Sequence, residues 1–338
     1  MVNRCPTGEK ISCGHRIEGA SSANDAGISR SVMRTMPSFF VVGAAKAGTT
    51  AIHHALSRHP SVFLPKQKET NYFALGGERP SYTGPLDADT INAFSVWRYG
   101  DYVDLFRRAP AGSTLGEVSP MYLYAEGAAS SIAASVPDAR IVMCLREPLA
   151  RAVSAYQHLV RDGRETETFE RAIALEQERV DAGWEWFWHL TAVSMYADQV
   201  ARYLDAFDRT QIRVYLYDDL RRDPGAIMTD LLAFIRAPPA SAMSLEEHNV
   251  AGVPRGWARR AHRALYAPGR LNACLRSVLP GVVRTAASNA FKRVAMGRPT
   301  HAIKVPSVLK ERFLGDVTRL ERVIERDLSH WKARLADA

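Results

Sequence analysis

The sequence has little cysteine and no long apolar run, and both absences narrow the class of protein. The cysteines are Cys5, Cys13, Cys144 and Cys274. None belongs to a C-x-x-C pair, so we predict reduced thiols, with neither a zinc site nor a disulfide framework. No stretch approaches the roughly 18 apolar residues of a membrane span. We therefore expect a globular protein without a transmembrane helix.

The amino-terminal residues 1–36 lack the apolar core of a signal peptide. They are rich in Ser, Gly, Ala and Asn, which predicts a disordered tail. The remaining residues 37–338 contain no internal repeat and no low-complexity segment, and we predict that they form a single domain. With 46% hydrophobic and 24% charged residues, the composition is that of an ordinary globular protein. We expect it in the cytoplasm.

Acidic residues are absent from 248–310, where Arg and Lys recur. The whole chain carries 44 Lys and Arg against 36 Asp and Glu, a net charge of +8, which points to an anionic partner. Residues 271–295 mix apolar and basic residues at helical spacing, so 254–304 is a candidate for peripheral contact with a membrane. A lid over an anionic cofactor, a platform for the acceptor and a plain solvated basic face are the alternatives.

One stretch has the order strand, glycine-containing turn, helix. The apolar run Phe39–Val42 predicts a buried strand, and a helical pattern runs from about Thr49 to Arg58. This geometry presents backbone N–H groups to an anion. The spacing of Gly43 and Gly48 is close to that of a Walker A loop, but Thr49 takes the place of the Walker lysine and Lys46 lies inside the loop. We predict a phosphate-binding loop that is not an ordinary nucleotide triphosphatase.

A second motif follows another apolar run. Ile141–Leu145 predicts a strand, Arg146 stands at its end, and Pro148 suits the first turn of a helix. Metal-dependent P-loop enzymes often place an aspartate that holds Mg²⁺ at such a strand end. A permanent cation there indicates an anionic ligand and no metal. Ser154 follows about two helical turns later, so its hydroxyl could join Arg146 on one phosphate.

Both motifs resemble those of sulfotransferases that use 3′-phosphoadenosine 5′-phosphosulfate (PAPS). The loop with Lys46 is similar to their 5′-phosphosulfate motif. The run R-E-P-x-x-R-x-x-S-x-Y-x-H, which begins at Arg146, is similar to their 3′-phosphate motif, above all in the heparan N-sulfating enzymes. A looser similarity around Arg255 suggests a segment that closes over the cofactor. The resemblance implies these cofactor-binding residues: Ala45, Lys46, Ala47, Gly48, Thr49, Thr50, Arg146, Ser154 and Arg255.

The resemblance also suggests catalytic residues. Lys68-Glu69-Thr70-Asn71-Tyr72-Phe73 is similar to the family's K-E-x-x-[FY]-F segment, whose glutamate is the base, and Glu69 would take that role. Heparan 3-O-sulfating relatives carry a histidine where this chain has Asn71, which separates it from them. Lys46 would neutralise the leaving oxygen. His158 could assist proton removal, bind the cofactor, or be a plain structural histidine, and the sequence leaves these open.

The expected fold is α/β and P-loop-like, with three layers and a central parallel sheet of about five strands flanked by helices. The predicted strands are 38–43, 61–64, 113–118, 140–145 and 212–217. The third of them ends in Glu117-Val118-Ser119-Pro120-Met121-Tyr122, similar to a family E-x-[ST]-P-x-Y segment. A charged helix is predicted over 168–179. Apolar residues from Leu309 to Trp331 fall on one face of what we predict as a single long terminal helix.

We therefore predict an enzyme that transfers the sulfuryl group of PAPS to a hydroxyl or amine, releasing adenosine 3′,5′-bisphosphate (PAP), without a metal. The acceptor could be a carbohydrate, a glycolipid or a small metabolite. Alternatives are a P-loop kinase or NTPase, which lacks its lysine here, and a basic module that binds nucleic acid or membrane. The second alternative leaves Lys46 and Arg146 unexplained, so we expect no nucleic-acid partner. The sequence leaves the oligomeric state open.

Overall fold

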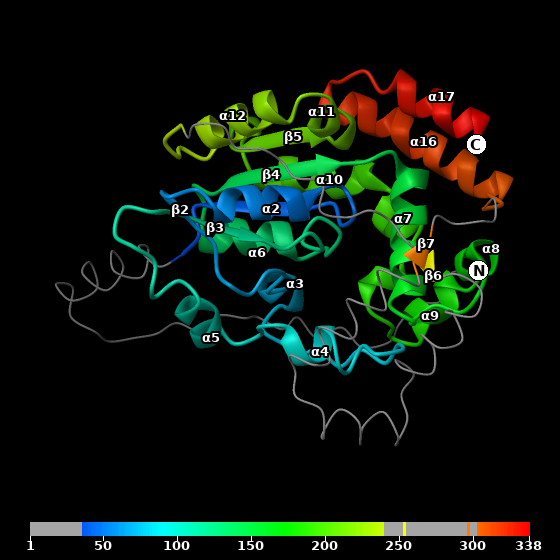
Figure 1. Ribbon diagram of the computed structural model, residues 1–338, viewed down its shortest axis with the longest axis horizontal. Helices are drawn as coiled ribbons and strands as arrows, with labels where there is room; N and C mark the ends of the chain where they lie inside the picture. The colour runs from blue at the N-terminus through cyan, green and yellow to red at the C-terminus, as the bar shows by residue number, and fades with distance from the viewer. Residues whose placement is uncertain (1–35, 240–252, 255–295, 298–302) are drawn as a thin grey trace, which may run out of the picture. The chain divides into compact units, whose positions relative to one another are not determined.

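The computed structural model describes residues 36–239, 253–254, 296–297 and 303–338 (Figure 1). Contacts divide the chain into Met1–Met36 and Pro37–Ala338, and the described helices and strands belong to the second unit. Residues 1–35 of the predicted tail lie outside the described residues, as do the predicted cofactor-binding residue Arg255 and most of the basic segment 248–310.

A parallel sheet forms the centre of the fold, in the order β2-β3-β1-β4-β5. Its strands are β1 Phe39–Gly43, β2 Val62–Phe63, β3 Thr114–Val118, β4 Arg140–Leu145 and β5 Ile212–Leu216. β1 is buried along its whole length and β4 beyond its first residue, as unbroken apolar runs predict. The expected five-stranded parallel sheet is thus confirmed.

The sheet register brings three strand ends to one edge. β1 pairs with β3 on one side, Val41 opposite Val118, and with β4 on the other, Gly43 opposite Met143. Because all three strands run in the same direction, the segments that leave their carboxyl ends meet. In open α/β sheets this edge is where ligands bind.

Helices flank the sheet, and two short strands pair apart from it. The α-helices are α2 Thr49–Ser57, α3 Tyr72–Leu75, α4 Ile91–Phe94, α5 Tyr99–Asp104, α6 Ala128–Ser135, α7 Pro148–Arg161, α8 Phe169–Ala174, α9 Glu176–Asp181, α10 Tyr196–Ala206, α11 Tyr217–Arg222, α12 Pro224–Phe234, α16 Ser307–Ile324 and α17 Ser329–Asp337. The 3₁₀ turns are η1 Trp186–Trp188, η2 Ala192–Ser194 and η3 Arg209–Gln211. β6 Val253–Pro254 pairs antiparallel with β7 Met296–Gly297. No helix among the described residues is long and apolar enough to cross a bilayer.

The start of α7 is determined locally. Pro148 occupies its first turn, and the Glu147 carboxylate accepts hydrogen bonds from the backbone N–H groups of Leu149 (2.8 Å) and Ala150 (2.7 Å). Proline and an acidic cap satisfy the free N–H groups of a helix start. The motif that follows β4 therefore starts a helix directly after Arg146.

Two helix predictions need correction. The predicted helix over 168–179 is two helices, α8 and α9, which meet at Leu175. The single terminal helix is also two, because Glu325 adopts a left-handed conformation (φ 53°) that ends α16. The Leu328 N–H then donates to the Glu321 carboxylate (2.9 Å) before α17 begins. Figure 1 shows α16 and α17 side by side.

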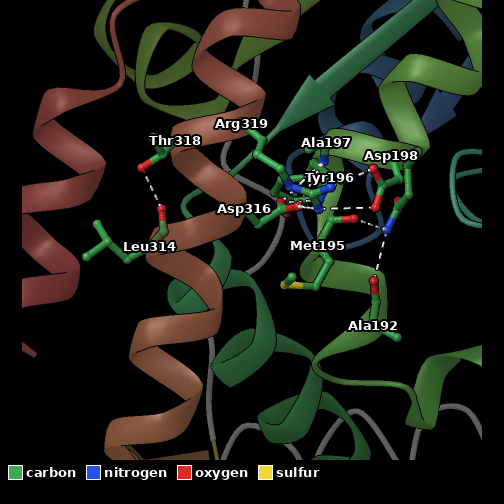
Figure 2. A network of polar contacts seen from close by, with 10 residues as sticks. Ala192, Met195, Tyr196, Ala197, Asp198, Leu314, Asp316, Thr318 and Arg319 are labelled. Atoms are coloured by element: carbon green, nitrogen blue, oxygen red, sulfur yellow. Dashed lines mark hydrogen bonds and ion pairs between the residues drawn. The ribbon is translucent and has the colours of Figure 1, made fainter.

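A buried carboxylate joins α16 to α10 (Figure 2). Asp316 accepts hydrogen bonds from the N–H groups of Tyr196 (2.6 Å) and Ala197 (3.3 Å), at the first turn of α10. Arg319 pairs with Asp316 and reaches Asp198 as well. A carboxylate at a helix start satisfies unpaired donors and suits the positive end of the dipole. The carboxyl-terminal helices are thereby attached to the body of the fold.

Candidate active site

The loop between β1 and α2 lies at the carboxyl edge of the sheet. Ala44 N–H donates to the Cys144 carbonyl of β4 (2.7 Å), which holds the loop against the neighbouring strand. Lys46 (φ 71°) and Gly48 (φ 96°) both adopt positive φ, and α2 begins at Thr49 as predicted. The predicted arrangement of strand, turn and helix is confirmed, with the helix start directly after the turn.

Gly48 is required by space as well as by backbone conformation. A Cβ atom on Gly48 would lie 2.8 Å from Leu220 Cδ2 and 3.1 Å from the Tyr217 ring. Both neighbours belong to α11, which follows β5. The loop is therefore packed from behind by a segment far away in the sequence, with its backbone close to that support.

Arg146 contacts the same loop from the end of β4. Its Nη1 donates to the Lys46 carbonyl (3.2 Å), and its guanidinium lies over the Tyr217 ring at 4.8 Å from the centroid. The two motifs, 100 positions apart, are thus brought together. Ser154 lies partly exposed on α7, and no hydrogen bond joins it to Arg146.

Arg151 lies beneath the loop and is fully buried. Its Nε donates to the Ala45 carbonyl (3.2 Å), and its Nη1 donates to the Leu190 carbonyl (3.1 Å) and to Ser194 Oγ (3.2 Å). Its Nη2 has no partner among the described residues. Burial lowers the pKa of Arg151 to about 10. The sequence contains this arginine as a motif position, but nothing in it indicated the contact with the loop.

Lys46 carries the loop's positive charge in a cationic neighbourhood. Burial, followed by the charge of Arg161, lowers its pKa to about 8, with Arg151 and Arg146 acting in the same direction and Asp162 opposing them. Several cations held close together repel one another unless an anion lies among them. The arrangement is that of an anion site.

Glu69 lies in the segment between β2 and α3, where it adopts a φ of 62°. Its N–H donates to the Val118 carbonyl at the end of β3 (3.0 Å). Lys68 Nζ lies 2.5 Å from the exposed Glu69 carboxylate and 3.2 Å from Thr50 Oγ1. Lys68 therefore connects Glu69 to the first turn of α2, so the candidate base and the loop share one edge.

A buried carboxylate holds the segment that carries Glu69. Glu117, at the end of β3, accepts hydrogen bonds from Thr70 (2.5 Å), Tyr102 (2.5 Å), Ser119 (2.7 Å) and Tyr122 (2.7 Å). Burial raises the pKa of Glu117, and these hydrogen bonds oppose the rise. The E-x-[ST]-P-x-Y pattern named three of these residues, but their convergence on one carboxylate was missed, because Thr70 and Tyr102 come from other segments.

Both ring nitrogens of His158 are engaged. Its Nδ1 pairs with Arg161 Nη2, and its Nε2 lies 3.3 Å from Asp162 Oδ2. Burial lowers the pKa of His158 to about 3, which Asp162 opposes and Lys46 reinforces. The imidazole is therefore neutral near pH 7, with Nδ1 as acceptor and Nε2–H as donor, which leaves no free lone pair for an acceptor proton.

A parallel α/β sheet whose carboxyl edge carries the Lys46 loop, with Arg146 and Arg151 in contact with it, is an arrangement that suits an anionic ligand. Residues 37–240 match the Sulfotransferase family, and the chain belongs to it. It is a sulfotransferase, an enzyme that transfers sulfuryl groups. Its described residues contain no group of side chains that could hold a metal ion.

This chain is similar to a sulfotransferase from Alicyclobacillus acidocaldarius, whose crystal structure is known. It shows 32% identity and a TM-score of 0.67, with 88% of this chain and 99% of that chain covered. The bifunctional heparan sulfate N-deacetylase/N-sulfotransferase 3 of Mus musculus is 28% identical over 63% of this chain and 24% of its own length. The membrane-associated sulfotransferase kil1 of Dictyostelium discoideum is 23% identical over 37% of this chain and 24% of its own. This chain thus spans about a quarter of these curated relatives.

Proposed function

We propose that the enzyme takes the sulfuryl group from PAPS and transfers it to a hydroxyl or amine of a carbohydrate, a glycolipid or a small metabolite. The observation that carries this proposal is the contact between Arg146 and the Lys46 carbonyl. A donor with phosphates at both ends of its ribose needs two adjacent anion sites. One strand end supplies a loop of N–H groups, and the next supplies a permanent cation.

The residues of the loop suit the 5′-phosphosulfate. Backbone N–H groups of Gly48, Thr49 and Thr50 lie at the start of α2, where helix geometry favours an anion. The N–H of Ala47, another predicted contact, already donates to the Ala44 carbonyl (3.2 Å). Lys46 would stabilise the negative charge that develops on the leaving phosphate oxygen. Gly48 has its backbone close to α11, so a side chain there would disturb the loop.

Arg146 and Ser154 would hold the 3′-phosphate. They flank the first two turns of α7, and Arg146 is oriented by the Tyr217 ring and the Lys46 carbonyl. Contact of these side chains with the 3′-phosphate would distinguish PAPS from ATP, which lacks that phosphate. Membership of the sulfotransferase family does not support a P-loop kinase or a nucleic-acid-binding module. The cytoplasmic location and a membrane contact through 254–304 stay predictions.

Sulfuryl transfer from this donor would be an in-line displacement at sulfur. The bond between sulfur and the acceptor atom forms as the bond between sulfur and the 5′-phosphate oxygen breaks. Glu69 would accept the acceptor's proton, and its exposed carboxylate is available for this. Lys68, paired with Glu69, would hold the Glu69 carboxylate in position. Thr70 and Glu117 would hold the Glu69 segment in place.

The proposal is tested by replacing Arg146 with glutamine. We expect the dissociation constant for PAP to rise at least tenfold, since a charge-assisted hydrogen bond contributes about 1.5–3 kcal/mol. Binding of adenosine 5′-phosphate, which lacks the 3′-phosphate, should change little. Titration calorimetry with both ligands measures this difference.

Arg140→Gln is the matched control, because Arg140 stands at the opposite end of the same strand. It should leave the affinities for both ligands unchanged. Equal losses for PAP and adenosine 5′-phosphate in Arg146→Gln would remove Arg146 from the 3′-phosphate. Failure of the wild-type protein to bind PAP would refute the proposed donor.

A further inference from the structure

Aromatic side chains gather directly beside the Lys46 loop. Ala45 packs in a small apolar cluster with Met121 and Val193, and the rings of Tyr124, Trp186 and Phe187 pack against this cluster. The Phe187 ring lies 5.0 Å from the His158 ring, and the Tyr82 ring lies 5.4 Å from Trp186. Since Ala45 immediately precedes Lys46, these rings adjoin the place where the sulfuryl group would be transferred.

The rings in this cluster are not all buried. Trp188 of η1 is fully buried and contributes to the core. Trp186 and Phe187, of the same 3₁₀ turn, are only partly buried, as are Tyr82 and Tyr124. Within this turn, Trp188 thus lies in the core, while Trp186 and Phe187 expose part of their surface.

Cations near these rings already have partners in the described part of the chain: Arg202 donates to the backbone carbonyls of Leu123 (3.2 Å) and Tyr124 (2.9 Å), and others pair with carboxylates. Three cations there lie beside carboxylates: Lys68 with Glu69 (2.5 Å), Arg161 with Asp162 (3.0 Å), and Arg164 with Glu185 (2.7 Å) and Asp87. Paired cations have little capacity left for a further anion. A polyanionic acceptor needs unpaired Arg or Lys side chains along its path.

We infer that the acceptor is an uncharged hydroxyl compound with a flat apolar face, which packs on Trp186 and Phe187. The inference rests on the proposed function and specifies its acceptor. Aromatic side chains bind such faces well, because they bury a large area at low entropic cost. A neutral sugar ring and a neutral phenol share this chemistry. The acceptor hydroxyl would then lie between these rings, Lys46 and the Glu69 carboxylate.

The test measures acceptor binding without turnover, by calorimetry on the full chain saturated with PAP. The probes are methyl glucoside, naphthol and heparosan, an unsulfated polymer of glucuronic acid and N-acetylglucosamine. We expect a neutral probe to bind, with an affinity that does not change between low and high salt. Binding of the glucoside would indicate that the acceptor is a neutral sugar, and binding of the naphthol would indicate a neutral phenol.

The variants are Trp186→Ala and Phe187→Leu, and the matched control is Tyr99→Ala, an exposed aromatic side chain on α5. Trp186→Ala and Phe187→Leu should each lower the affinity for the neutral probe roughly tenfold. PAP affinity should stay unchanged, which also shows that the variants fold. Tyr99→Ala should bind both ligands as the wild type does.

Three results would overturn the inference: salt-sensitive binding of heparosan in preference to the neutral probes, no binding of either neutral probe, or unchanged neutral-probe affinity in both variants. None of these results would count against PAPS as the donor, because PAP binding is measured separately in the same samples. Conversely, loss of PAP binding alone would count against the proposed function.

Discussion

Glu69 and His158, the two side chains near the loop proposed to accept a proton, differ in their freedom to do so. The Glu69 carboxylate is exposed and has one cationic neighbour, Lys68. His158 already pairs through both ring nitrogens, with Arg161 and Asp162. A base needs a free lone pair that points to the acceptor. We therefore propose Glu69 as the base and a supporting role for His158, a choice that the sequence left open.

Replacing Glu69 with glutamine keeps the shape and removes the basicity. We predict a kcat lower by about two to four powers of ten, with PAP affinity nearly unchanged. His158→Ala should lower kcat far less, since its nitrogens serve other side chains. Turnover measured alongside PAP binding separates the two residues. Normal turnover in Glu69→Gln together with failure of His158→Ala would reverse the assignment.

The lowered pKa of Lys46 leads us to predict that donor binding depends on pH. Burial and the charge of Arg161 lower its pKa to about 8. Below that pH the free enzyme carries the charge that an anion needs, and above it binding must first take up a proton. The dissociation constant for PAP should therefore rise as pH increases past about 8, by up to about tenfold per pH unit. The ligand's phosphates are fully ionised in this range.

Lys46→Arg provides the comparison, because a guanidinium stays charged throughout this range. Its PAP affinity should remain level as pH rises, even if its turnover is impaired. Calorimetric titrations of both proteins across the alkaline range give the two curves. Parallel curves would mean that another group titrates.

At the scale of elements, α7 connects the Lys46 loop to the segment around Leu190 and Ser194, which follows the Trp186–Trp188 turn. Its start is capped by Glu147 next to Arg146, and its buried Arg151 joins the loop carbonyl of Ala45 to Leu190 and Ser194. A guanidinium can make these contacts at once because its donors form a planar fork. Arg151 is thus a positioning residue for the loop.

Arg151→Lys keeps the charge and loses the fork. We predict a lower free energy of unfolding by about 1–3 kcal/mol, since buried carbonyls lose their donors. The dissociation constant for PAP should also rise several-fold as the loop loosens. Ser194→Ala removes one partner of Arg151 away from the loop, so it should lower stability while sparing PAP affinity. If both variants affect PAP equally, Arg151 has only a structural role.

At the scale of the whole molecule, the carboxyl-terminal helices support the donor site from a distance. Trp331 of α17 is fully buried, and its Nε1 donates to Asp218 (2.8 Å); Arg334 contacts the same carboxylate (2.8 Å). Asp218 lies on α11 beside Tyr217, whose ring lies against the Arg146 guanidinium and would be 3.1 Å from a Cβ atom at Gly48. The end of the chain thereby holds the segment that packs behind the loop.

Trp331→Ala should therefore affect both stability and ligand binding. Removing a buried indole costs about 3–5 kcal/mol of the free energy of unfolding. PAP affinity should fall as well, because Asp218 of α11 loses one of its partners on α17. Denaturant unfolding and PAP titration measure the two effects. Leu314→Ala, at a 40% exposed position on α16, is the control and should change neither; unchanged PAP affinity in Trp331→Ala would separate α17 from the site.

The sequence by itself determined the parts that depend on neighbouring residues. Apolar runs predicted the five parallel strands, and the glycine spacing predicted the turn before α2. Arg146 and Pro148 predicted a cation at a strand end followed by a helix. Such features follow from local backbone geometry, in which each residue's preference agrees with those of its neighbours.

Only the tertiary structure decided which distant polar groups meet. Arg151 and Ala45 are 106 positions apart, and Trp331 and Asp218 are 113 apart. The hydroxyls around Glu117 come from several segments, and the left-handed Glu325 divides a helix whose apolar pattern continues. A buried polar group must find a partner wherever packing brings one. That partner is set by the path of the whole chain, which no local pattern contains.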